Sequence, residues 1–173
     1  MLYNYFCINY QFYYYKIDNS FRLIIKYNLM QKLMVTHFNT ETWRENQRWR
    51  EANNHEGCIY NTPVYIKDTI PYLIKIFVVE MNNESNKIMG IGRIVNKVRM
   101  DKKYKIYSDN NYNRFTYRGR QRITREEIPI EDLQKLENRL FKGKHHLKRG
   151  QGIIQVPNDV IIKFMPIICD LFT

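Results

Sequence analysis

Two apolar runs in the centre of the chain carry its clearest structural signal. Residues 72–80 and residues 87–95 are both rich in β-branched and aromatic side chains, which predicts a strand in each. The polar segment 82–86 between them is typical of a turn, so we expect an antiparallel hairpin. Gly90 and Gly92 lie on one face of the second strand, where missing side chains permit a bulge, a bend or the close approach of another group.

Shorter runs on both sides of this hairpin predict additional strands. They show the same preference for β-branched and aromatic residues, and turn-forming residues separate them. The runs span residues 58–60, 104–107, 114–117, 120–123 and 153–156. Together with the hairpin, they predict a domain built around a β-sheet.

Helical patterns lie at both ends of this β-rich region. The segment that begins at Thr42 has the form of a capping box, and the helix formers after it predict a helix over residues 42–53. A second helix should open at Pro129 and end before Gly143, with apolar residues at helical spacing, namely Leu133, Leu136, Leu140 and Phe141. Residues 159–172 are apolar but interrupted by a proline, so the type of this last element stays open.

Residues 1–33 differ in composition from the rest of the chain. They contain ten Tyr and Phe residues among Asn, Ile and Lys, and they lack Gly, Pro and Ala, which is typical of A/T-rich coding sequence. Three interpretations stay open: an aromatic strand pair, a poor signal peptide, or upstream sequence preceding a true start at Met30 or Met34. We favour the last, because the segment has neither a processing site nor turn residues. We therefore expect an N-terminal extension at 1–33 and a single α+β domain at 34–173.

Charge and cysteine usage narrow the class of protein. The 28 Lys and Arg residues outnumber the 17 Asp and Glu residues, and the formal net charge of +11 favours a polyanionic partner, most commonly nucleic acid. The three cysteines are widely spaced, which argues against a disulfide framework and favours a reducing, intracellular compartment. No run approaches the roughly 18 uninterrupted apolar residues of a membrane span, so we expect a soluble protein without a membrane partner.

The most strongly charged stretch, residues 97–125, interleaves cationic and aromatic side chains. Its ten Lys and Arg residues face only two Asp. Cations bind a phosphate backbone through counterion release and aromatic faces stack on bases, so the stretch indicates a nucleic-acid interface. The predicted contact residues are Arg114, Tyr117, Arg118, Arg120, Arg122 and Arg125, and the base-stacking candidates are Trp43, Trp49, Tyr112 and Phe115. The other interpretation is a strand pair with a solvated cationic face and an aromatic core face.

A second basic cluster lies in the glycine-rich segment 142–152. Its glycines let backbone amides approach an anion, and its cations are Lys142, Lys144, Lys148 and Arg149, which together indicate a phosphate-binding loop. The segment matches neither the Walker nor the dinucleotide-binding pattern, so a solvated loop is the other interpretation. We expect this segment and the stretch 97–125 to face one groove.

Signals for catalysis and for metal binding are weak. His145 or His146, beside Lys144, offers a general base and charge stabilisation for RNA cleavage. No His or Cys spacing matches a zinc pattern, and serine is too scarce to favour a hydrolase triad. We therefore expect no metal and no cofactor, and we favour a binding protein over an enzyme.

The order of elements in the centre of the chain resembles a known superfamily. A short strand, the pair Ile70-Pro71, a strand at 75–81 and a glycine-bearing strand at 88–95 are similar to the small β-barrels of the PUA-like superfamily, which includes the EVE, ASCH and YTH families. The resemblance covers residues 58–156 and implies a small mixed or antiparallel β-barrel with two to four flanking helices. It also implies recognition of RNA, or of a modified base, in an aromatic pocket beside a basic groove.

These observations favour a non-enzymatic module that binds RNA or DNA. The alternatives are a metal-independent ribonuclease, which the ASCH resemblance implies, and a structural protein that neutralises polyanions without a pocket. The segments 80–83, 87–92, 107–114 and 142–152 also resemble proteins of large DNA viruses, which implies a location in the cytoplasm or nucleus of an infected host cell.

Overall fold

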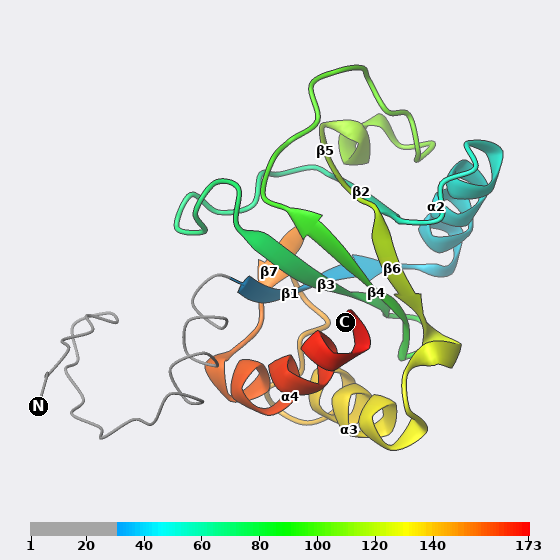
Figure 1. The fold of residues 1–173 in the computed structure, drawn as a ribbon. Coiled ribbons are helices and arrows are strands. Elements are labelled where there is room, and N and C mark those ends of the chain that lie inside the picture. The colour runs from blue at the N-terminus through cyan, green and yellow to red at the C-terminus, as the bar shows by residue number, and fades with distance from the viewer. Residues whose placement is uncertain (1–30) are drawn as a thin grey trace, which may run out of the picture.

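The structure, a computed structural model, describes residues 31–173 and is organised around a five-stranded mixed sheet (Figure 1). In spatial order the strands are β6 (Gln121–Thr124), β4 (Lys87–Val95), β3 (Lys75–Asn82), β1 (Gln31–Phe38) and β7 (Ile153–Gln155). β1 pairs parallel with β3, and every other pairing in this sheet is antiparallel. The expected α+β class is confirmed.

The expected barrel is not closed. β6 and β7 are the two edges of the five-stranded sheet, and β2 (Cys58–Thr62) pairs with β5 (Phe115–Gly119) in a separate two-stranded sheet. The insertion of β1 next to β3 places β6 and β7 at opposite edges, so no ladder joins them in the described residues. The sheet is therefore open.

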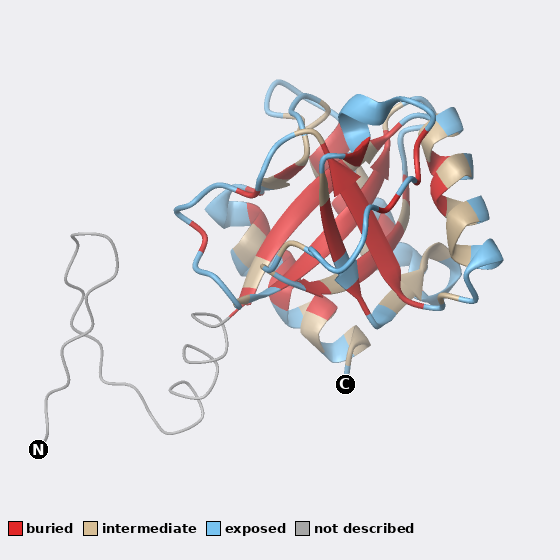
Figure 2. Cartoon of the chain, turned by 90° about the horizontal axis from the view of Figure 1, so that it is seen from above, coloured by how far each residue is buried: buried red, intermediate tan, exposed pale blue. Residues whose placement is uncertain are grey.

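Both faces of the five-stranded sheet are covered (Figure 2). α3 (Ile130–Phe141) and α4 (Asn158–Leu171) pack on the face that carries Phe77 and Val79. α2 (Thr40–Ala52) and the β2–β5 pair pack on the face that carries Ile76 and Val78. Burial on two faces explains why the sequence of β3 is almost continuously apolar, because both sets of alternating side chains enter a core.

The predicted hairpin is confirmed, with its register shifted at one point. β3 starts at Lys75 because the residues before it form a turn in which Leu73 has a φ of 64°. Glu80 pairs with Gly90 whereas Met81 pairs with Ile88, so Met89 has no partner and forms a bulge. The bulge lets groups of neighbouring strands approach β4, and the Arg122 Nη2 of β6 donates to the Met89 carbonyl at 2.9 Å.

The helix predicted over residues 42–53 is present but begins one half-turn earlier. Asn39 is its N-cap: the Asn39 Oδ1 accepts a hydrogen bond from the Thr42 amide at 2.7 Å, and the Thr42 hydroxyl accepts one from the Asn39 amide at 3.0 Å. Thr42 is therefore the N3 residue, the last of the capping box, and not its N-cap. An asparagine side chain caps as effectively as threonine, which the expected Ser/Thr-x-x-Glu pattern left out.

The C-terminal helices complete the core. The helix predicted after Pro129 is confirmed, and its buried residues are Leu133, Leu136, Leu140 and Phe141. Gly143 follows it with a φ of 81°, a conformation that glycine adopts without strain. The segment whose type stayed open is α4, a helix that contains Pro166.

Residues 104–107 do not form the predicted strand. The side chains of Tyr104, Ile106 and Tyr107 enter the core, but the amides of Ile106 and Tyr107 donate to the Asn113 Oδ1 at 3.0 and 3.1 Å. The Asn113 amide nitrogen in turn donates to the Tyr107 carbonyl at 2.6 Å. One buried asparagine thus replaces a neighbouring strand, which an apolar pattern does not reveal.

The domain begins before the expected boundary at residue 34. Residues 31–33 are the start of β1, and Leu33 is completely buried between the sheet and the C-terminal helices. The three interpretations concern the segment 1–33, of which residues 1–30 lie outside the described part of the chain.

Candidate nucleic-acid interface

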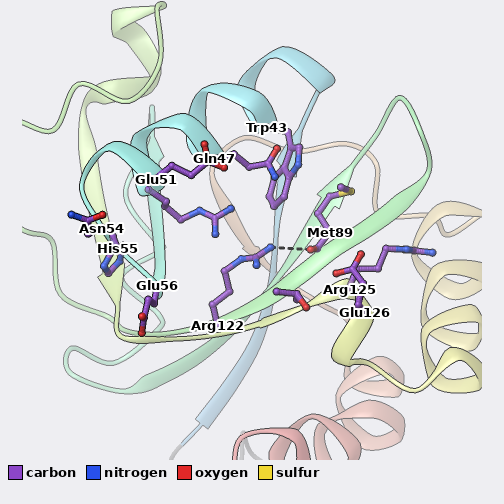
Figure 3. A pocket seen from close by; sticks show the side chains of 12 residues that line it. Trp43, Gln47, Glu51, Asn54, His55, Glu56, Met89, Arg122, Arg125 and Glu126 are labelled. Carbon is purple, nitrogen blue, oxygen red and sulfur yellow. Dashed lines mark hydrogen bonds between the residues drawn. The ribbon is translucent and has the colours of Figure 1, made fainter.

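A cleft of about 460 Å³ lies between α2 and the β4–β6 edge of the sheet (Figure 3). Trp43, Gln47 and Arg50 line it from α2, and Arg122 lines it from β6. The remaining wall comes from the loop after α2, from the bulge in β4 and from the short 3-10 helix η2 (Arg125–Glu127). The volume lies within the range of ligand-binding clefts.

A buried ion pair forms the floor of this cleft. The Arg122 Nε donates to both carboxylate oxygens of Glu80 at 3.0 and 3.1 Å, and its Nη2 donates to the Oε2 at 2.6 Å. The Tyr60 hydroxyl donates to the Glu80 Oε1 at 2.8 Å. The exposed fractions are 6% for the Arg122 side chain and 1% for that of Glu80. Burial disfavours the charged guanidinium, but the adjacent carboxylate outweighs this effect and raises the pKa of Arg122.

Two glycines make room for this network. A Cβ at Gly90 would lie 2.5 Å from the Arg122 Nη2 and 2.8 Å from the Glu80 Oε2. A Cβ at Gly92 would overlap the Tyr60 hydroxyl. The predicted close approach at these glycines is confirmed, and the group that approaches is the ion pair beneath the cleft.

Arg50 is the second guanidinium of the cleft, and it has no acidic partner within residues 31–173. Its side chain is half-buried, and its Nε donates to the Asn46 Oδ1 at 3.1 Å. Its Cζ lies 5.5 Å from the centre of the Trp43 ring, and the Cζ of Arg122 lies 5.4 Å from the same ring. Burial of the side chain lowers the pKa of Arg50, and the nearby positive charge of Arg122 lowers it further. A half-buried and unpaired cation is costly, which favours an anionic or electron-rich ligand.

His55 and Arg118 extend this positive region to the rim. The His55 Nε2 donates to the Cys58 carbonyl at 3.2 Å, so its Nδ1 is free to accept a hydrogen bond from Arg118, also at 3.2 Å. Burial lowers the pKa of His55, and the charges of Arg118 and Arg50 lower it further. The imidazole is therefore a neutral acceptor that fixes Arg118 beside the cleft.

The predicted arginines fall into two groups. Arg122 and Arg125 form ion pairs with Glu80 and Glu137, so their charges are already neutralised. Arg114, Arg118 and Arg120 are exposed. Tyr117 was also a predicted contact, but its ring is 1% exposed and its hydroxyl accepts a hydrogen bond from the Ile66 amide at 3.0 Å. Tyr117 thus belongs to the protein interior, because alternate residues of a strand point to opposite faces, whereas Arg122 lies at the floor of the cleft.

The predicted stacking residues do not gather at one site. Trp43 lines the cleft, but its exposed fraction is only 7%. Trp49 lies six positions further along α2 and packs against Tyr104, with ring centres 5.8 Å apart. Phe115 stacks on the exposed Tyr65 at a ring-centre distance of 3.6 Å, away from the residues of the cleft. Tyr112 is exposed and packs edge-on against Tyr107.

The loop at 142–152 does not contribute to the cleft lining. The His37 Nε2 donates to the Leu147 carbonyl at 2.6 Å, and the Asn83 amide donates to the Lys148 carbonyl at 2.9 Å, which hold the loop at the ends of β1 and β3. Among the predicted residues of the loop, Lys142, Lys144, His145 and Arg149 are exposed, whereas His146 and Lys148 are half-buried. The loop 142–152 and the stretch 97–125 were expected to face one groove, but no residue of the loop lines the cleft.

Arg50 was missed by the sequence interpretation although a signal for it exists. It lies seven residues after Trp43, so the two side chains share one face of a helix. Gln47, four residues after Trp43, lies on the same face and also lines the cleft. A search for polar residues at helical spacing from Trp43 would have identified this face.

The described residues offer no metal site and no membrane-spanning helix. No three of their His, Cys, Asp and Glu side chains converge as metal ligands. None of the helices in residues 31–173 combines the length and hydropathy that crossing a bilayer requires.

The chain matches no protein-family model, no curated protein and no solved structure with which it was compared. The cleft and its surrounding charges therefore carry the argument about function.

Proposed function

We propose that this protein is a nucleic-acid-binding module that accepts a base in the cleft between α2 and β6. The exposed arginines Arg118 and Arg120 contact the phosphate backbone next to the cleft. Membership of the PUA-like superfamily, with its implied base-binding pocket, is part of this proposal and not a premise of it.

The observation that carries the proposal is the unpaired guanidinium of Arg50 in a half-enclosed cleft. The second guanidinium, that of Arg122, is neutralised by Glu80, so the charge of Arg50 has no structural partner in the described residues. Nucleobases present acceptor atoms to which arginine donates, and the adjacent phosphates are attracted by Arg118 at the rim. A net charge of +11 supplies long-range attraction to such a polyanion.

The test is the salt dependence of binding to a labelled single-stranded oligonucleotide, measured from about 50 to 200 mM salt. The double variant Arg118→Gln/Arg120→Gln should reduce the slope of log K against log salt by about 1–2, because each lost phosphate contact removes roughly one unit. The control Lys135→Gln/Lys163→Gln removes two charges from α3 and α4, on the opposite face of the sheet, and should leave the slope unchanged.

Two results would contradict the proposal. The first is the absence of binding at low salt. The second is an equal loss of affinity in both double variants, which would indicate polyanion binding over the whole surface and favour the structural, charge-neutralising alternative.

A further inference from the structure

We propose that the base held in the cleft is guanine, with Arg50 on its Hoogsteen edge and Glu126 on its Watson–Crick edge. This inference rests on the proposed function and adds the identity of the base. It follows from the charges that line the cleft, from the atoms of Arg50 that remain available, and from the hydrogen-bonding pattern of the four bases.

Groups of opposite charge line the cleft without pairing with one another. Arg50 and Glu126 both line it, and neither takes part in an ion pair within residues 31–173. Glu126 is exposed, and its neighbour Arg125 is already held by Glu137. In Figure 3, Glu126 projects from the strand side of the cleft, opposite the helix from which Trp43 and Gln47 project. A ligand between the two walls can therefore meet a cation on one side and a carboxylate on the other.

The available atoms of Arg50 are its two terminal nitrogens. Its Nε is used by Asn46, which is itself 1% exposed and donates to the Ile59 carbonyl at 2.8 Å. Neither terminal nitrogen has a hydrogen-bond partner among the described residues. The buried asparagine thus fixes the guanidinium and leaves both terminal nitrogens available to donate to a ligand in the cleft.

Guanine is the base whose two hydrogen-bonding edges match Arg50 on one side of the cleft and Glu126 on the other. Its Hoogsteen edge carries two adjacent acceptors, N7 and O6, to which arginine donates in the commonest specific contact. Its Watson–Crick edge carries the N1–H and N2–H donors, which a carboxylate accepts. Adenine places an N6–H donor beside N7 and would direct it at Arg50, cytosine presents a single amino donor, and thymine presents a single acceptor, O4, beside its methyl group. Trp43 and the thioether of Met89 provide apolar contact.

The test compares affinities for oligothymidine strands that carry one central guanine, adenine, cytosine, 7-deazaguanine or hypoxanthine. The guanine strand should bind about tenfold more tightly than the adenine and cytosine strands, as one good bidentate contact provides. 7-Deazaguanine lacks the N7 acceptor and hypoxanthine lacks the N2 amino group, so each should lose most of that preference. Free GMP should compete far more weakly than the guanine strand, because it lacks the neighbouring phosphates.

Three single variants test which residues contact the base. Arg50→Lys keeps the charge but not the paired donors, so it should retain salt-sensitive binding and lose the preference for guanine. Glu126→Gln should also lose the preference for guanine. Arg48→Gln removes an exposed charge from the same helix outside the cleft lining and should keep the preference. Melting temperatures measured by circular dichroism verify that each variant is folded.

The outcomes separate this inference from the proposed function. Equal affinity for all five strands, with the salt dependence intact, would overturn the assignment of guanine and leave nucleic-acid binding in place. No binding to any strand at low salt would overturn both. If GMP competes as well as the guanine strand, guanine recognition stands but its source is a free nucleotide, and the proposed function is wrong.

Discussion

Replacement of Glu80 by glutamine should strongly destabilise the protein. Glu80→Gln conserves the shape of the side chain but removes the charge that neutralises Arg122, whose guanidinium is 6% exposed. Removing one partner of a buried pair typically costs about 3–5 kcal/mol, because an uncompensated charge is left behind. In a domain of this size, each kcal/mol corresponds to roughly 2–4 °C, so the melting temperature should fall by about 6–20 °C.

The assay is urea unfolding followed by circular dichroism, with Glu131→Gln as the matched control. Glu131 pairs with Lys135 at 3.9 Å and is 84% exposed, so its replacement should change the free energy of unfolding by less than about 0.5 kcal/mol. In the double variant Glu80→Gln/Arg122→Gln no unpaired charge remains, and we expect it to be more stable than Glu80→Gln alone.

Two results would refute this reasoning. The first is a Glu80→Gln variant whose free energy of unfolding lies within about 1 kcal/mol of the parent, which would mean that Arg122 reaches solvent or another anion. The second is a double variant whose destabilisation equals the sum of the two single changes, because additivity would show that the two side chains are not coupled.

Three other predictions concern single buried groups. Burial lowers the pKa of His37, so its contribution to stability should be complete above about pH 6.5 and decline as the pH falls; His37→Gln should flatten the stability profile between pH 8 and 5. Burial raises the pKa of the Cys58 thiol to about 12, so in native protein Cys58 should resist iodoacetamide longer than the half-buried Cys169, as peptide mass mapping would show. Equal labelling rates would contradict the burial. Gly92→Ala should cost about 1–3 kcal/mol in urea unfolding, because its Cβ would displace the Tyr60 hydroxyl, and an unchanged midpoint would refute this.

The candidate site was only partly accessible to sequence analysis. Trp43, Arg122 and Arg125 were among the predicted binding residues and all three line the cleft, whereas Arg50 and Glu126 were not predicted. The reason is that the role of a charged residue depends on its partner. Arg122 is neutralised by a carboxylate 42 positions away, and no local pattern indicates that pairing.

Local sequence patterns were sufficient to predict most helices and strands of this protein. Runs of β-branched and aromatic residues predicted β3 and β4, helical spacing predicted α3, and glycines marked the points of close approach. These features depend on neighbours within a few residues, which interact in the same way wherever the segment lies in the fold.

The order of the strands, the open sheet and the division of one arginine-rich stretch into exposed and buried members depend on tertiary contacts. Arg118 and Arg122 are both cations in short strands, yet one lies at the rim of the cleft and the other beneath it. Their difference arises because β6 pairs with β4 beside Glu80, and such pairing is set by the packing of distant segments and not by the residues next to each arginine.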